Sequence, residues 1–568
     1  MAEFLLVFFL AVALGWPLGH YLAAVMRGAP MRGDRVFGWI ERPAYRLLGT
    51  DPAQGMGWKG YAAAFLLSNL AVGVVVWVVL MTQAWLPLNP NHAPNMRWDL
   101  ALHTMVSFLT NTNQQHYSGQ AQLSFLAHMT AIVGLQVVTP MMGLALVAAT
   151  LRGLFGGRAN SRGQVDGGAA AVDVGNYWAD VLRPTVRFLM PLCLAFSLLL
   201  TWQGVPATLQ GGPVATPLDA QARMKEQKIP LGPVAPMVAI KQLGSNGGGW
   251  YGPNSAVPLE NPTPLSNVVQ MLAIVLIPVA VAFMVGPFTG RRKFSALVVG
   301  TMLAMSLATT AAALWSEAWS STAQDIALME GKEVRFGAEP SALWAALTTS
   351  VNNGSVNMMH DSAAPLTGLV AMANMLVNAI WGGVGCGLQQ FLVYLLLAVF
   401  LAGLMTGRTP ELFGRKIEAG EVKLLAVLAL LQPLVLLGLT AATLAMPSVT
   451  GASNPSFHGI SQVFYEYASA FANNGSGFEG LGDATAWWNL TCALVLALGR
   501  YPALILPLVI AAQLGAKRAA PEGPGTPQVE TPTFALTLVA IVVVLTLLQF
   551  MPVLVLGPVA DHLALMAS

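Results

Sequence analysis

Ten apolar segments of membrane-crossing length occur in this sequence, and they restrict its fold more than any other feature. A helix needs about 20 mostly apolar residues to cross the hydrocarbon core of a bilayer. The segments lie at residues 3–25, 60–82, 123–151, 178–202, 265–288, 294–316, 369–406, 422–446, 487–515 and 532–557. Only 10% of the 568 residues are charged, compared with about 25% in soluble domains. We therefore expect an all-α integral membrane protein with ten transmembrane helices in contact with lipid.

Lysine and arginine are distributed unevenly between the two sides of these helices. Twenty of the 28 fall in alternate connections, beginning with the loop after the first segment, and seven fall on the opposite side. Because cytoplasmic loops carry the excess of basic residues, we expect the first loop in the cytoplasm and both termini outside it. The N-terminal segment has no basic region before it, so we interpret it as a retained helix and not as a signal peptide.

Each of the four long outer connections contains a similar polar motif. The motifs are SFLTNTNQQHYSG at 107–119, QLGSNGGGWYGPNS at 242–255, TTSVNNGSVNMMHDS at 348–362 and SAFANNGSGFEGLG at 469–482. A gap-free alignment places one asparagine of each motif in the same column: Asn111, Asn246, Asn353 and Asn474. These asparagines are 135, 107 and 121 residues apart. Such spacing, with two crossings per unit, predicts four helix–pore loop–helix repeats.

The repeats divide the chain into six parts. We expect pore repeats at 60–151, 178–288, 294–406 and 422–515. An N-terminal flanking helix with its basic loop lies at 1–59 in this scheme, and a C-terminal flanking helix lies at 532–568.

A short apolar stretch precedes each motif and is too short to cross the membrane. These stretches are Leu100–Leu109, Val234–Leu243, Ala342–Ser350 and Ile460–Phe471. Each is expected to enter the membrane as a half-helix whose C-terminal end points at the motif. A helix C-terminus carries about half a negative charge, so four such ends around one axis favour a cation.

The motif residues are of the types that a potassium filter requires. Backbone carbonyl oxygens replace the water around K+ in such filters. Aligning successive carbonyl groups requires positive φ angles, which glycine adopts freely and asparagine tolerates better than most residues. We therefore expect a pseudo-fourfold filter that binds K+ as the transported substrate.

The same motifs resemble those of the KdpA family, the potassium-binding subunit of the Kdp potassium-transporting ATPase. The resemblance covers essentially the whole chain and includes ENPTPLSN at 260–267 and GRTPELFGRKIE at 407–418. It implies high-affinity K+ uptake across a bacterial inner membrane by an ATP-driven complex. The implied partners are a P-type ATPase subunit that hydrolyses ATP, a small subunit with an extracytoplasmic domain, and sometimes a very short single-helix subunit. No nucleotide site is expected in this chain, which lacks a DKTGT motif and a nucleotide loop.

The resemblance also implies which residues form the filter. They are Thr110, Asn111, Thr112 and Asn113 in the first repeat, Ser245, Asn246, Gly247 and Gly248 in the second, Asn353 and Gly354 in the third, and Asn473, Asn474 and Gly475 in the fourth. In the alignment Thr112 stands in the column of the glycines. The third repeat has Asn352-Asn353 where the family often has Ser-Cys or Ser-Thr, which leaves the geometry of that strand open.

Two features inside apolar segments are candidates for gating or for the ion path. Arg500 lies in the segment 487–515, and an arginine near a helix centre costs about 2.5–3.5 kcal/mol on insertion scales. It either limits leak below the filter or diverts the ion sideways, or else it snorkels or pairs structurally. Gly382, Gly383 and Gly385 lie in the segment 369–406, where they indicate close packing or a helix break. The length of that segment favours a break.

Other polar residues near the motifs have local roles to consider. His360 and Asp361 either tune the charge of the outer mouth or form loop hydrogen bonds, and Lys241 and Glu466 are candidates for ion pairs on half-helices. A net charge of +2 gives no reason to expect a nucleic-acid partner.

Two other functions compete with a pump subunit. A self-sufficient channel or symporter of the Trk/Ktr type shares the fourfold plan, and only the family resemblance and the two flanking helices favour the pump. A membrane-embedded enzyme is disfavoured, because the sequence shows no nucleophile–base pairing and no metal-ligand spacing.

Overall fold

The fold is a bundle of long apolar helices. The computed structural model describes residues 2–31, 33–156, 172–219, 223–319, 329–454, 456–521 and 528–567. Within these ranges, ten helical segments are long and apolar enough to cross a membrane, and the described strands are only two pairs of two-residue strands. The predicted all-α membrane fold is therefore confirmed.

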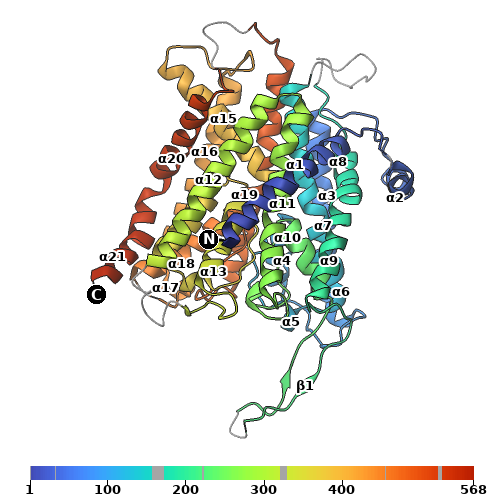
Figure 1. The fold of residues 1–568 in the computed structure, drawn as a ribbon, viewed down its shortest axis with the longest axis vertical. Helices are drawn as coiled ribbons and strands as arrows, with labels where there is room; N and C mark the ends of the chain where they lie inside the picture. The colour runs from blue at the N-terminus through green and yellow to red at the C-terminus, as the bar shows by residue number, and fades with distance from the viewer. Residues whose placement is uncertain are drawn as a thin grey trace.

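The ten crossings follow the predicted segments closely, and three of them contain a π-helical turn (η2, η3 and η8). They are α1 (Ala2–Met26), α3 (Trp58–Thr82) with η1 (Gln83–Trp85), α6 (Phe125–Ala127) with η2 (His128–Ile132) and α7 (Val133–Phe155), α8 (Tyr177–Pro184) with η3 (Thr185–Leu189) and α9 (Met190–Trp202), α11 (Pro264–Thr289), α12 (Arg292–Trp319), α15 (Cys386–Met405), α16 (Ala419–Leu444), α19 (Ala486–Ala516), and α20 (Pro532–Leu554) with η8 (Val555–Val559) and α21 (Ala560–Ala567). Figure 1 shows them running roughly along the length of the molecule.

Four helices end inside the bundle instead of crossing it. They are α4 (Trp98–Leu109), α10 (Val234–Leu243), α13 (Ala338–Val351) and α18 (Ser456–Ala472). Each contains one of the four predicted half-helices, and nine of the ten residues of α10 are buried, Pro236 being the exception. Irregular backbone at membrane depth is tolerated only where protein surrounds it or where it lines a cavity. The surrounding crossings therefore allow these half-helices to end, and irregular backbone to follow them, at membrane depth.

The long apolar segment 369–406 is not one helix. Helix α14 (Pro365–Val377) ends at Asn378, which has a φ of 50°, and α15 begins only at Cys386. The intervening residues include Gly382, Gly383 and Gly385, all with positive φ. The predicted helix break is confirmed, because glycine and asparagine accept the left-handed conformation that a helix cannot contain.

Several smaller elements lie outside the crossings, in segments that we expected from the sequence to be loops. Helix α2 (Asp34–Leu47) occupies the first basic loop and stands away from the bundle in Figure 1. The strands β1 (Val214–Ala215) and β2 (Gln227–Lys228) form a hairpin that projects from the opposite end. The remaining elements are α5 (Gly119–Gln122), η4 (Asn254–Ala256), η7 (His360–Ser362), β3 (Glu411–Leu412), β4 (Arg415–Lys416) and α17 (Pro447–Thr450).

The buried core lies around α7 and α11, most of whose residues are inaccessible. Helix α1 packs along α11, and α20 lies at the edge of the bundle (Figure 1). The two helices expected to flank the repeats thus lie toward the periphery, while the four half-helices meet in the middle.

Candidate ion-binding site at the ends of four half-helices

Each half-helix continues into a short segment of irregular backbone, called a strand below, and the four segments share one backbone pattern. Two residues with positive φ are separated by one residue with negative φ. The pairs are Asn111 (59°) and Asn113 (76°), Ser245 (49°) and Gly247 (79°), Asn352 (56°) and Gly354 (83°), and Asn473 (57°) and Gly475 (106°). We call the four strands, residues 111–114, 245–248, 352–355 and 473–476, the strand ring.

The residue between each pair makes the same hydrogen bond in all four strands. Its backbone N–H donates to the carbonyl oxygen five residues earlier, at the end of the half-helix. The bonds run from Thr112 to Ser107 (2.9 Å), Asn246 to Lys241 (3.0 Å), Asn353 to Thr348 (2.9 Å) and Asn474 to Ser469 (2.9 Å). The four strands are therefore equivalent in their backbone conformation.

This equivalence corrects the alignment of the first motif by one residue. Thr112, and not Asn111, occupies the position of the central asparagines, and Asn113 occupies the position of the glycines. A β-branched threonine is poorly suited to positive φ, whereas asparagine tolerates it. Thr110 caps α4, and its hydroxyl bonds the Val106 carbonyl oxygen at 2.9 Å.

The strands are neighbours in chain order around the ring. A Cβ atom added at Gly247 would overlap the carbonyl oxygen of Asn353 in the next strand. The same is true of Gly354 with the Asn474 carbonyl, and of Gly475 with the Thr112 carbonyl. The absence of a side chain at these glycines is what allows adjacent strands to approach so closely.

The remaining neighbours, the first and second strands, are joined by a side chain. The Asn111 amide donates to the carbonyl oxygen of Gly244, just before the second strand, at 3.0 Å, and to that of Ser245, in the strand, at 3.5 Å. The strand ring is therefore closed.

Asparagine side chains brace the third and fourth strands from behind. The Asn353 amide donates to the Lys241 carbonyl oxygen at 3.1 Å, and the Asn474 amide donates to the Thr348 carbonyl oxygen at 2.9 Å. The side-chain oxygen of each accepts the backbone N–H two residues later, at 3.0 Å and 2.9 Å. Asn353 thus reproduces the contacts of Asn474, so the unusual Asn352-Asn353 pair leaves the third strand braced like the fourth.

The broken segment between α14 and α15 lies against the inner end of the strand ring. The backbone N–H groups of Trp381 and Gly382 donate to the carbonyl oxygen of Ser350, at 3.0 Å and 2.9 Å. The N–H of Val384 donates to the Ser245 hydroxyl at 3.1 Å. This segment, which we call the break loop (residues 378–385), therefore contacts the ends of both α10 and α13.

Arg500 lies beside the break loop and is only 5% exposed. Its Nη1 donates to the sulfur of Cys386 at 2.6 Å, and its Nη2 lies 3.4 Å from the carbonyl oxygen of Thr139. In the part of the chain that the structure describes, Arg500 forms no ion pair. The sequence left open whether Arg500 pairs structurally, and these contacts place an unneutralised positive charge close to the broken helix.

Lys241, a predicted ion-pair residue, has Glu260 as its partner. Both side chains are fully buried and bonded to each other, and the Lys241 ammonium also donates to Asn254 Oδ1 at 2.5 Å. Glu260 Oε1 accepts the N–H groups of Trp250 and Tyr251, at 2.8 Å and 3.0 Å. The pair ties α10 to the loop that follows the second strand. In the sequence, Glu260 is marked only by its place in ENPTPLSN.

Glu466, the other predicted ion-pair residue, joins the fourth repeat to the first. Gln114 donates to Glu466 Oε1, and His116 Nε2 lies 3.3 Å from the same oxygen. His116 Nδ1 contacts Asn489 Oδ1 at 2.7 Å. Burial lowers the pKa of His116, but the charges of Asp483 and Glu466 outweigh burial and raise that pKa to about 9. His116 is therefore mainly protonated at neutral pH.

His360 and Asp361, in the segment that follows the third strand, both form hydrogen bonds with residues of α18. His360 Nδ1 lies 2.9 Å from the Tyr465 hydroxyl. His458, at the start of α18, contacts Asp361 Oδ1 at 2.9 Å and Asp561 Oδ2 at 3.0 Å. One imidazole thus links the third repeat, the fourth half-helix and the C-terminal helix α21.

This link is expected to depend on pH. Burial lowers the pKa of His458, but the bonds and charges of Asp361 and Asp561 outweigh burial and raise it to about 9. Because this pKa exceeds the ordinary value of 6.5, the stabilisation is fully present below pH 6.5 and is lost as pH rises through about 9. We expect His458→Gln to lower the Tm by several degrees at about pH 6 and hardly at all at about pH 10. An equal loss of Tm at both pH values would contradict this.

Ten crossings around four converging half-helices, with a closed ring of irregular backbone at their C-terminal ends, define a multi-pass membrane protein of the pore-loop class. The family described as KdpA, potassium-transporting ATPase A subunit, matches residues 5–563 of the chain. The chain belongs to this family.

Curated relatives match the chain over nearly its full length. The potassium-transporting ATPase potassium-binding subunit of Gloeobacter violaceus is 44% identical, over 98% of this chain and 97% of that protein. The protein of the same name from Pseudomonas putida is also 44% identical, over 99% of this chain and 98% of its own length.

A solved structure shares the fold at low sequence identity. The potassium transporter TrkH from Vibrio parahaemolyticus superposes with a TM-score of 0.50 at 14% identity, over 87% of this chain and 97% of that one. This likeness concerns the arrangement of the helices alone.

Proposed function

We propose that this chain is the potassium-binding, filter-bearing membrane subunit of an ATP-driven K+ uptake complex. K+ enters from the outer side, loses its water at the strand ring and passes from there into the complex. The filter residues predicted from the sequence, except Thr110, provide the lining together with Asn352, Gln114, Ser355 and Ser476. Because filters of this kind coordinate K+ with backbone carbonyl oxygens, we assign the ligands to the backbone of the four strands.

The observation that carries this proposal is the repeated pair of positive-φ residues at the four half-helix ends. The pattern costs strain at Asn111, Asn113, Ser245, Asn352 and Asn473, since non-glycine residues are rarely left-handed. Such strain is retained where the surrounding structure enforces it, which is typical of a functional site. Four negative helix ends beside the ring favour a monovalent cation there.

The partners and the membrane follow from the family. We propose a P-type ATPase subunit that hydrolyses ATP, a small subunit with an extracytoplasmic domain and a very short single-helix subunit, in the inner membrane of a bacterium. In Figure 1 the C-terminus lies low in the view and the N-terminus lies near mid-height. Helix α2 of the basic first loop lies higher than both, which supports termini outside the cytoplasm.

A transport assay separates the pump subunit from a channel. The chain is reconstituted in vesicles alone and together with its ATPase subunit, and uptake of K+ or Rb+ is followed with and without ATP. We expect uptake only with the partner and ATP. Robust ATP-independent flux through the chain alone would instead indicate a channel or symporter of the Trk/Ktr type.

Replacing Arg500 tests the ion path below the strand ring. We propose that its buried charge repels K+ that would otherwise leak past Gly382, Gly383 and Gly385 of the break loop. Arg500→Ala is expected to raise ATP-independent leak by roughly tenfold, the effect of about 1.4 kcal/mol on a barrier. Arg500→Lys keeps the charge and should leak little. Unchanged leak and unchanged K+ affinity in Arg500→Ala would rule out this role.

A further inference from the structure

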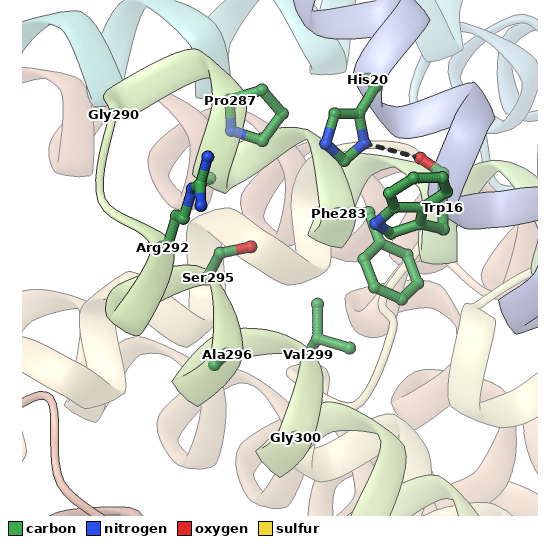
Figure 2. Close-up of a pocket in the computed structure, with 11 residues that line it drawn as sticks. Trp16, His20, Phe283, Pro287, Gly290, Arg292, Ser295, Ala296, Val299 and Gly300 are labelled. Atoms are coloured by element: carbon green, nitrogen blue, oxygen red, sulfur yellow. Dashed lines mark hydrogen bonds between the residues drawn. The ribbon is translucent and has the colours of Figure 1, made fainter.

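A groove on the side of the bundle opens between α1 and the hairpin of α11 and α12. Its volume is about 950 Å³. Figure 2 shows Trp16 of α1 next to Phe283 of α11 on one side, Pro287 of α11 above, and Val299 of α12 below. None of these residues belongs to the strand ring or to the break loop, so the groove is separate from the proposed ion path.

Small residues keep the groove empty of side chains. The lining includes Gly286, Gly290 and Gly300 together with Ser295 and Ala296. A Cβ atom added at Gly290 or Gly300 would meet no other atom within 4 Å. The surface is therefore hollow because the sequence places glycine where a larger side chain would fill the space.

One end of the groove is cationic and the rest is mainly apolar. Arg292, at the start of α12, is exposed at that end, and within the described ranges it has no ion-pair or hydrogen-bond partner. Its neighbour Arg291 is different, because it contacts Glu530 at 3.3 Å and lies over the Phe413 ring. Arg292 is thus the basic residue that remains available to an anion at the mouth of the groove.

The length of the groove along α12, from Arg292 to Gly300, suits a lipid. Gly300 is eight residues after Arg292 on the same helix, which corresponds to about 12 Å at 1.5 Å per residue. Arg292 belongs to the basic side of the protein, where the membrane surface is expected to be cytoplasmic and anionic. Trp16 is exposed on the opposite side of the groove from Arg292, where it adds an aromatic wall for an acyl chain (Figure 2).

From this arrangement we propose that the groove binds an anionic phospholipid of the cytoplasmic leaflet. The phosphate lies against Arg292 and Ser295, and an acyl chain follows Trp16, Phe283 and Val299 toward the membrane centre. A transmembrane helix of a partner is a poorer match. A helix is 10–12 Å wide with its side chains and has no reason to bring an anion to one end of the groove.

The test uses the whole complex, delipidated in detergent and titrated with phosphatidylglycerol or with phosphatidylcholine, with bound lipid counted by native mass spectrometry. Arg292→Gln removes the charge, and Gly300→Leu fills the groove from a position with free space around it. The matched controls are Arg518→Gln, another exposed arginine on the basic side, and Gly438→Leu, a membrane-facing glycine of α16 with equally free surroundings.

We expect one tightly bound phosphatidylglycerol to disappear in Gly300→Leu and to bind roughly fivefold more weakly in Arg292→Gln, the effect of about 1 kcal/mol per basic residue near an anionic surface. Both controls should keep it, and phosphatidylcholine should bind less well than phosphatidylglycerol to the wild type. Equal retention in all four variants would overturn the proposal. A groove that takes up no lipid in the complex, and in which Val299→Cys cross-links to a partner subunit, would overturn it in favour of a protein occupant.

Discussion

Replacing Gly475 by alanine is expected to remove high-affinity K+ uptake. Gly475 has a φ of 106°, a conformation that costs a residue with a Cβ atom about 1–3 kcal/mol. The new methyl group would also overlap the carbonyl oxygen of Thr112 in the neighbouring strand. The strand ring must open at the contact between the fourth and first repeats, so its carbonyl oxygens no longer surround the ion.

The expected result is a loss of K+ affinity of at least tenfold, and roughly a hundredfold if the strain approaches 3 kcal/mol. The measurement is the K+ concentration that half-saturates ATP-dependent uptake by the reconstituted complex. Gly438→Ala is the matched control, since its surroundings are free and it lies far from the strand ring in the sequence. Wild-type K+ affinity in Gly475→Ala would show that the strand ring does not hold the ion.

The sequence predicted the membrane architecture well because its signals are local and strong. Apolar length alone defines a crossing, so nine of the ten segments agreed closely with the structure, and in the tenth, 369–406, only Cys386–Met405 crosses. The half-helix Val234–Leu243 has the predicted bounds, because Pro233 precedes it and the glycine-rich motif follows it. The break after Val377 was also foreseeable, since a run of nearly forty apolar residues, with four glycines gathered between Trp381 and Gln390, exceeds one crossing.

The register of the first strand was not predictable in the same way. The gap-free alignment followed the identity of Asn111 with the asparagines of the other motifs. Backbone conformation follows the permitted φ of each residue instead, and Asn113 replaces a glycine in that respect. The first motif therefore fits two registers: Asn111 can align with the central asparagines, or Asn113 can align with the glycines. The hydrogen bond from Thr112 to Ser107 decides between them, and only the structure contains it.

Contacts between side chains far apart in the chain could not be predicted from the sequence either. Lys241 stood out as a charge on an apolar half-helix, but nothing in the spacing singled out Glu260 among the 26 acidic residues. His116 and Glu466 are 350 residues apart. Their contact arises because the ring closes between its last and first repeats, and local patterns contain no information about that closure.

Glu260→Gln is expected to be the most destabilising single substitution behind the strand ring. Lys241 and Glu260 are fully buried, so removing one charge leaves the other without compensation. Breaking a buried pair in this way costs about 3–5 kcal/mol. The carboxylate also accepts two backbone N–H groups, from Trp250 and Tyr251, which would share the weaker neutral oxygen of glutamine. We expect a large fall in the Tm of the purified complex and weaker K+ binding, because the Lys241 carbonyl oxygen accepts the N–H of Asn246 in the second strand.

The double variant Lys241→Met/Glu260→Gln separates charge from shape. A buried ion pair often contributes little compared with neutral side chains of similar size, and most of the loss comes from the unpaired charge. The double variant should therefore recover a substantial part of the Tm that Glu260→Gln loses, while Lys241→Met alone should resemble Glu260→Gln. If the losses of the two single variants simply add in the double variant, the side chains act independently, and the ion pair does not hold the second strand in place.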